Sequence, residues 1–143
     1  MAKLTRTKLI KKLDSVFSQY IRLKDSKDGI GTCITCGKQD HIKRLQAGHM
    51  ISRKHYSTRW DERNVKIQCV GCNVFRYGEQ FKFGLYLGIT LSKQLLADSR
   101  KLVKFTNNEL EEMITHYSNE VKKYTWVLFL VFIVSLLRGW LLI

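Results

Sequence analysis

The sequence predicts a small α+β zinc-knuckle domain with flanking helices and an apolar helix at the C-terminal end. Three features predict this class: two Cys-x-x-Cys pairs, helical periodicity on both sides of them, and a nearly charge-free final stretch. The 143 residues leave room for one small domain plus appendages. We expect a basic amphipathic helix and loop (1–31), a zinc-knuckle core (32–88), a helical region (89–124) and an apolar tail (125–143).

The first segment has the pattern of an amphipathic helix. Leu9, Leu13, Phe17 and Tyr20 recur at helical spacing, and lysines and arginines occupy the other positions. This predicts a helix over roughly residues 5–24. The basic N-terminus contains no apolar run, so we expect no signal peptide and a cytoplasmic, reducing setting.

Helical patterns also follow the second cysteine pair. Residues 73–87 are expected to be helical, although Gly78 and Gly84 interrupt the pattern, and 92–103 to form the next helix. Thr106-x-x-Glu109 has the spacing of a capping box that starts a last helix. The core candidates of this segment are Phe75, Phe81, Leu85 and Tyr86. For its aromatic residues we favour core packing over base stacking; they are Phe75, Tyr77, Phe81 and Phe83.

The composition is strongly basic. Lys and Arg number 25 against 12 Asp and Glu, which gives a formal net charge of +13. Such an excess favours a polyanionic partner, because each neutralised phosphate releases condensed counterions. A nucleic acid is the preferred interpretation, and a plain basic surface, a ribosome-associated one or a membrane-associated one remains an alternative.

The four cysteines form the clearest site. Cys33 and Cys36 make the first pair, and Cys69 and Cys72 the second. Four thiolates suit a tetrahedral Zn²⁺, and a site with all four positions taken by cysteine is structural, since none is left for water. Unrelated free thiols and an iron–sulfur cluster are the alternatives, but the spacing lacks ferredoxin-type runs.

The 32 residues between the pairs exceed what a simple zinc ribbon needs. In chain order they contain Ala47-Gly48-His49 and then Asn64, and Asn73 follows directly after Cys72. This order resembles the HNH (ββα-metal) nucleases, in which a hairpin and a helix surround one ion, and the phage endonuclease VII family. The closer resemblance is to the phage NinG/Rap family. The similar stretches are 33–37, 47–49, 59–64 and 68–73, and the likeness runs from about Lys8 to Tyr124.

The resemblance implies a metal-dependent DNA endonuclease that acts on branched recombination intermediates in the bacterial host cell. His49 would be the general base, Asn64 would hold the hairpin loop and the His49 ring, and Asn73 would bind a catalytic Mg²⁺ or Mn²⁺. Many HNH nucleases have a second metal ligand just before the base, where this chain has Gly48. Three residues are candidates to replace it: His55, Asp61 and Glu79.

Two further expectations concern DNA and self-association. Arg53, Lys54, Arg59 and Arg63 lie near His49 in the sequence and are either phosphate contacts or a solvated basic loop. Symmetric cutting of a junction would suggest a homodimer. The rival functions are a non-catalytic, zinc-dependent DNA-binding protein that assists recombination, and a membrane-tethered basic protein with structural zinc.

The tail differs from the rest of the chain. Residues 125–137 carry no charge, and Arg138 interrupts the apolar run. A membrane span needs about 20 apolar residues, so a membrane contact through 125–143 is one interpretation. A frameshifted end and a helix that packs on the domain or on a partner are the others.

Overall fold

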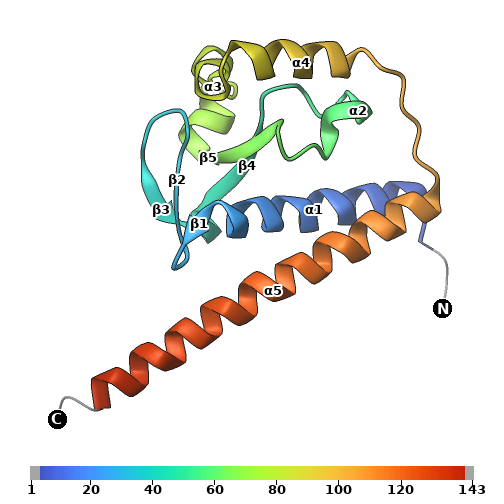
Figure 1. Cartoon of the computed structure of the whole chain (residues 1–143). Helices are drawn as coiled ribbons and strands as arrows, with labels where there is room; N and C mark the ends of the chain where they lie inside the picture. The colour runs from blue at the N-terminus through green and yellow to red at the C-terminus, as the bar shows by residue number, and fades with distance from the viewer. Residues whose placement is uncertain (1–3, 141–143) are drawn as a thin grey trace.

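The computed structural model describes residues 4–140. In chain order the elements are α1 (Arg6–Lys24), β1 (Ser26–Lys27), β2 (Ile30–Thr32), β3 (Gln39–His41), the 3₁₀ turn η1 (Ile42–Arg44), β4 (Leu45–His49), α2 (Tyr56–Arg59), β5 (Val65–Cys69), the π-helical turn η2 (Gly71–Phe75), α3 (Gln80–Leu87), α4 (Ile89–Ser99) and α5 (Asn107–Trp140). The mixed helix and sheet composition confirms the α+β class. In Figure 1, α5 lies beside α1, and the β4–β5 hairpin, α3 and α4 lie on the other side of α1.

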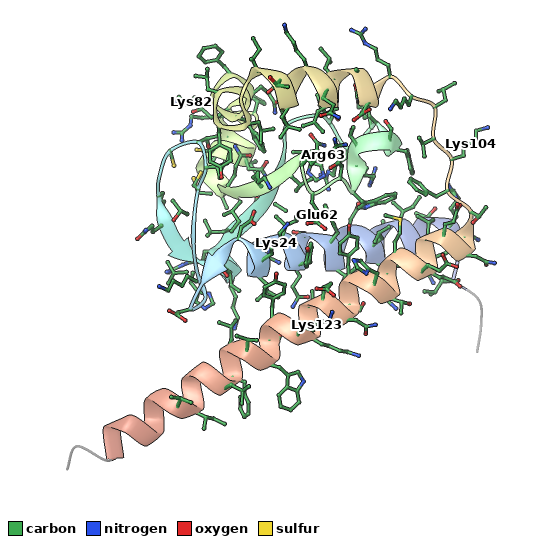
Figure 2. All side chains as sticks on the ribbon, viewed as in Figure 1. Lys24, Glu62, Arg63, Lys82, Lys104 and Lys123 are labelled. Carbon is green, nitrogen blue, oxygen red and sulfur yellow. The ribbon has the colours of Figure 1, made fainter. Side chains whose placement is uncertain are left out.

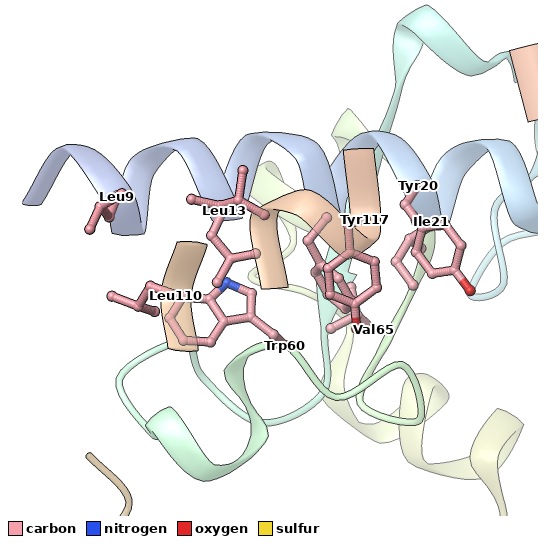
Figure 3. Close-up of a cluster of buried hydrophobic side chains, with 10 residues drawn as sticks. Leu9, Leu13, Tyr20, Ile21, Trp60, Val65, Leu110 and Tyr117 are labelled. Carbon is pink, nitrogen blue, oxygen red and sulfur yellow. The ribbon is translucent and has the colours of Figure 1, made fainter. Parts of the chain in front are cut away.

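The main apolar core lies between α1, α5 and the hairpin. Its members are fully or nearly fully buried and are drawn in Figure 3. They are Leu9, Leu13, Phe17, Tyr20 and Ile21 of α1, Trp60 and Val65 of the hairpin, and Leu110, Ile114 and Tyr117 of α5. The apolar positions of the predicted first helix are thus its buried face, and the helix itself is confirmed as α1.

The hairpin at the centre pairs β4 with β5 in antiparallel register. Leu45 lies opposite Cys69 and His49 opposite Val65. Since β4 and β5 form a two-stranded sheet, β4 is an edge strand. β4 begins only at Leu45, because η1 occupies Ile42–Arg44, and β5 ends at the first cysteine of the second pair. Figure 2 shows Lys24 of α1 close to Glu62, and this ion pair ties the loop before β5 to α1.

The last helix begins where the capping box predicts. The Thr106 backbone N–H donates to Glu109 Oε2 at 2.6 Å, and the Glu109 N–H donates to Thr106 Oγ1 at 3.2 Å. α5 then continues through the expected boundary at residues 124 and 125 without a break. The end of the predicted tail, residues 141–143, lies outside the described residues. Over residues 4–140, no helix has both the length and the apolar character that a membrane crossing needs.

Two segments differ from the prediction. The expected loop after α1 contains the short β1–β2 hairpin, with Asp28 and Gly29 at positive φ in its turn. The helix expected over 73–87 is broken, because the chain turns between η2 and α3. In this turn Tyr77, Gly78 and Glu79 all have positive φ (52°, 84° and 49°), a conformation that a right-handed helix excludes.

The break also changes which aromatic side chains are buried. Phe83 is buried, as expected. Most of the expected core candidates are instead exposed, and the prediction for them was wrong; they are Phe75, Tyr77, Phe81, Leu85 and Tyr86. The reason is that the main core forms between α1, α5 and the hairpin, whereas η2 packs on β5 and α3 packs on α4, which leaves most of their side chains uncovered.

Candidate metal centre and active site

The two cysteine pairs meet in one cluster. The four Sγ atoms all lie within 4.8 Å of one another, and Cys36 Sγ lies 3.7 Å from Cys69 Sγ. A tetrahedral zinc with Zn–S bonds of about 2.3 Å places its sulfur atoms roughly 3.8 Å apart. The donor set and its spacing therefore fit a zinc ion, and the four cysteines could hold one.

Each pair is shaped by its local backbone. In the first knuckle the Gly37 N–H donates to the Cys33 carbonyl at 2.9 Å, and the Cys33 N–H to the Lys38 carbonyl at 2.8 Å. Gly37 has φ of 73°, which glycine adopts without strain. In the second pair Cys69 ends β5 and Cys72 lies buried in η2. The first knuckle, the end of β5 and the turn η2 thus bring the four sulfur atoms into one cluster.

The pKa values of the thiols differ across the cluster. Burial opposes ionisation of Cys33, but hydrogen bonds from Thr35 and from backbone amides outweigh it and lower the pKa to about 6. For Cys36, a backbone hydrogen bond at Lys38 favours the thiolate, but burial and the neighbouring thiols outweigh it and raise the pKa to about 12. Four adjacent thiols cannot all ionise without a cation among them, which a zinc ion would provide.

A cleft of about 910 Å³ runs along the free edge of β4, and it contains both His49 and Asn73. Its remaining walls come from α1, from the loop that follows β4, and from the segment that runs from η2 to the start of α3. Asn73 lies 24 positions after His49 in the sequence. Both border the cleft because β5 pairs with β4, the strand that ends in His49, and η2, which carries Asn73, follows β5. His49 and Asn73 therefore border the same cleft.

His49 is fixed by a single ring hydrogen bond. Its Nε2 lies 2.9 Å from the Arg59 carbonyl oxygen. A carbonyl only accepts, so Nε2 carries the proton and Nδ1 holds the lone pair in the neutral ring. Burial lowers the His49 pKa below its ordinary value of 6.5, although the Arg59 hydrogen bond opposes this, and the positive charge of Arg53 lowers it further. The ring is therefore neutral near pH 7 and can accept a proton.

Asn64 closes the loop between β4 and β5. It is fully buried, its Oδ1 accepts from the Ile51 N–H at 2.7 Å, and its Nδ2 donates to the carbonyls of Ile51 (3.0 Å) and Thr58 (2.9 Å). Thr58 directly precedes Arg59, whose carbonyl holds His49. Asn64 thus holds the backbone next to Arg59, whose carbonyl binds the His49 ring. Asn64 is not among the described residues that line the cleft.

Asn73 is oriented by a neighbouring amide. Its Nδ2 donates to Gln46 Oε1 at 2.7 Å. This leaves the Asn73 carboxamide oxygen as the group available to a ligand, and a carboxamide oxygen is a hard donor suited to Mg²⁺ or Mn²⁺.

The four basic residues named from the sequence fall into two groups. Arg53 and Lys54 are exposed, and Arg53 lines the cleft. Arg59 instead makes a two-pronged ion pair with Asp14 of α1, at 2.6 and 3.0 Å, and its side chain is 16% exposed. Arg63 pairs with Asp61 and Asp98. Carboxylates of the protein thus already engage the guanidinium groups of Arg59 and Arg63, and a phosphate contact by either residue stays a prediction.

The three residues considered as a second metal ligand are engaged elsewhere. His55 Nδ1 lies 3.0 Å from the Ser99 carbonyl, Asp61 binds Arg63, and Glu79 pairs with Arg76 and Lys82. Of the residues that the structure describes, none of these three lines the cleft.

Gln68 is a structural residue that sequence reasoning missed. It is fully buried, and its Nε2 donates to the Gly78 carbonyl at 2.8 Å and to Thr35 Oγ1 at 3.2 Å. A Cβ on Gly48 would lie 1.9 Å from Gln68 Oε1. Gly48 is therefore required where many HNH nucleases have a metal ligand, because the Gln68 side chain fills that space. The only signal in the sequence was Gln68 beside Cys69.

Arg22 also lines the cleft and was not selected from the sequence. Its guanidinium donates to the carbonyls of Ser18 and Ile42. Burial lowers the pKa of Arg22 from its ordinary range, although the group stays cationic. It adds a second positive charge to that of Arg53 at this cleft.

Fold and cluster together define a mixed helix-and-sheet protein with a cysteine site that could bind zinc. The family model described as bacteriophage lambda NinG protein matches residues 1–125. The chain belongs to the NinG family, as its motifs predicted. Comparison with curated proteins and with solved structures found no significant match.

Proposed function

We propose that this protein is a metal-dependent, HNH-type endonuclease that hydrolyses DNA phosphodiester bonds in branched recombination intermediates. NinG membership and the possible zinc-binding cluster fit a recombination-related role on DNA. The observation that carries the proposal is the shared cleft: His49 and Asn73 line it together, beside the cysteine cluster that positions Asn73.

The proton chemistry follows from the His49 tautomer. With Nε2 donating to Arg59, Nδ1 is free to take a proton from water in the cleft. The water oxygen attacks phosphorus, the bond to the leaving oxygen breaks, and that oxygen takes a proton from solvent. A divalent ion bound at Asn73 would supply charge stabilisation for the phosphate. Arg53 and Arg22 add positive charge along the path of the backbone.

A second function has one observation in its favour. Among the described residues the cleft offers no carboxylate or second histidine to complete the metal shell, since Gly48 replaces the usual ligand. A weakly bound ion would leave a non-catalytic, zinc-dependent DNA-binding protein that assists recombination.

Cleavage assays separate the two functions. Zinc-loaded protein is incubated with a four-way junction and with linear duplex, with or without added Mg²⁺ or Mn²⁺; chelators are avoided because they would also remove zinc. We expect the junction to be cut only when the divalent ion is added. His49→Ala should lose at least about 100-fold in rate, the scale of general-base catalysis, and retain DNA affinity.

His55→Ala is the matched control, because His55 lies six positions after His49 in the connection between β4 and β5 and is not among the described residues that line the cleft. Equal losses in the two variants, or ion-dependent cleavage that His49→Ala leaves intact, would contradict the assignment of the base. Sedimentation of the protein–junction complex tests the accompanying proposal that two copies act on one junction. Cell fractionation with and without residues 125–143 tests whether the protein acts in the host cytoplasm or associates with a membrane through its tail.

A further inference from the structure

Tyr77 has an unusual position for an aromatic residue. Its side chain is 88% exposed, yet it lines the same cleft as His49 and Asn73. Exposing a large aromatic ring to water forgoes the burial that normally stabilises it. A ring that stands free beside a cationic cleft is the arrangement that stacks on nucleic-acid bases.

The backbone under Tyr77 is strained and firmly held. Tyr77 and Glu79 have φ of 52° and 49° on either side of Gly78. Non-glycine residues with positive φ cost free energy, and such strain concentrates at functional sites. The Gly78 N–H donates to the Cys72 carbonyl at 2.9 Å, and the buried Gln68 amide donates to the Gly78 carbonyl at 2.8 Å.

The cysteine cluster supports this turn as well. Arg76 Nη2 lies 2.7 Å from Cys72 Sγ, and the Arg76 guanidinium also pairs with Glu79 at 2.6 Å. The turn that carries Tyr77 is thus tied to the sulfur site on both sides. A rigid mount lowers the conformational entropy lost when the ring stacks on a base.

The charges of the cleft favour DNA over another protein as the partner of this ring. Arg22 and Arg53 line the cleft with Tyr77, and the chain carries a net charge of +13. A duplex hides its base faces within the stack, whereas a branch point exposes unpaired or unstacked bases that an aromatic side chain can contact.

We propose that Tyr77 stacks on an unpaired base at the branch point and so makes the cleft select branched DNA over linear duplex. This inference rests on the proposed function, since it assigns the source of that site's substrate preference. Tyr77 is a specificity-determining residue here and takes no part in the proton transfer.

Binding of defined DNAs tests the proposal. Zinc-loaded protein without added Mg²⁺ or Mn²⁺ is titrated with a fork that has two unpaired arms and with a duplex of the same paired sequence. We expect Tyr77→Ala to weaken fork binding by roughly 5- to 100-fold, the range for loss of one stacked base, and duplex binding by less than about 2-fold. Tyr77→Phe retains the ring and should restore fork binding.

Phe81→Ala is the matched control. Phe81 is 79% exposed and follows the same turn, but it does not line the cleft among the described residues. We expect it to leave the fork preference unchanged. A 2-aminopurine placed at the branch point gives a readout that a structural role would not move: its fluorescence should fall when wild type or Tyr77→Phe binds, and stay high with Tyr77→Ala.

The outcomes separate the two proposals. Unchanged fork preference in Tyr77→Ala, or a change in self-association in place of DNA binding, would overturn the role of Tyr77 and leave the nuclease assignment intact. Wild-type protein that binds forks through Tyr77 but cuts no DNA with Mg²⁺ or Mn²⁺ would overturn the nuclease and leave the stacking in place.

Discussion

The two sides of the cleft are held in place by different physics. On one side, His49 is held by the Arg59 carbonyl, and the Arg59 side chain is anchored on Asp14 of α1, beside a core of ten buried side chains. On the other side, Asn73 directly follows Cys72. Cys72 belongs to a small cluster of five buried residues, three of which are cysteines. Ordinary packing suffices for the first side, whereas the second has too small a core to be stable without an ion.

The largest effect should come from loss of zinc. Structural zinc sites contribute about 10–16 kcal/mol to the folding of zinc-finger peptides, and the five-residue cluster has nothing of that size to replace it. We expect Cys72→Ser to lose bound zinc and cleavage together, while α1 and α5 remain helical. Zinc content reports on the cysteine cluster, and far-ultraviolet circular dichroism reports on the helices. A Cys72→Ser protein that keeps its zinc would show that Cys72 is not needed to bind the ion. One that loses all its helix would show that α1 and α5 depend on the zinc site for their fold.

Truncation in the apolar core should come next. Phe17 is 2% exposed and packs against Tyr117 with ring centroids 4.9 Å apart. We expect Phe17→Ala to lower the free energy of unfolding by about 3–5 kcal/mol, as measured by urea denaturation of the zinc-loaded protein. Leu102→Ala is the control, because the Leu102 side chain is fully exposed, and it should change stability by less than about 0.5 kcal/mol.

The link between α1 and His49 can be broken at Asp14. Its carboxylate accepts from Arg59 and from Trp60 Nε1 at 2.9 Å, and both donors lose this partner in Asp14→Ala. We expect a loss of about 1–3 kcal/mol in stability, and a fall in kcat in the still-folded fraction, because Arg59 positions the base. Asp40→Ala is the control: the partners of this carboxylate, Lys38 and Arg44, are 60% and 74% exposed, so its loss should change stability far less than the loss of Asp14.

Acid should inactivate the His49 side. Burial holds the pKa of His49 below 6.5, and only the neutral ring accepts a proton. The value of kcat/KM should therefore be constant above pH 6.5 and fall about 10-fold per pH unit once the pH drops below the lowered pKa. A pH–rate profile with zinc content measured at each point checks this. If kcat/KM already begins to fall above pH 6.5, the group that titrates is not His49.

The sequence predicts best those features that depend on neighbouring residues. The Cys-x-x-Cys pairs, the capping box at Thr106 and the amphipathic α1 all signal themselves within a few positions, and each is found in the structure. His49 and Asn73 were found through the order of a family motif, and the hairpin register then brings them to one cleft. Local pattern and motif order thus suffice for the site's outline.

Features that depend on distant partners could not be predicted in this way. The ion pair between Arg59 and Asp14 could not be predicted, because the two residues lie 45 positions apart in the sequence. The apolar pattern after Cys72 predicted a buried helix, because periodicity identifies a face but not whether another element covers it. Tyr77 illustrates this limit. Its positive φ interrupts the predicted helix, and its side chain is exposed because no other element covers it.

The smallest effects should distinguish the cleft arginine from the paired one. Arg53 lines the cleft, whereas Arg63 is held by Asp61 and Asp98. If Arg53 neutralises one phosphate, Arg53→Ala should reduce the slope of log K against log salt by about 0.9. Arg63→Ala should leave that slope unchanged, because its charge is already balanced within the protein. Fork titrations at several salt concentrations measure both slopes. If both variants reduce the slope, DNA also contacts the Arg63 ion pair, and the contact surface extends beyond the cleft toward α4, which carries Asp98. If neither variant reduces the slope, Arg53 contacts no phosphate.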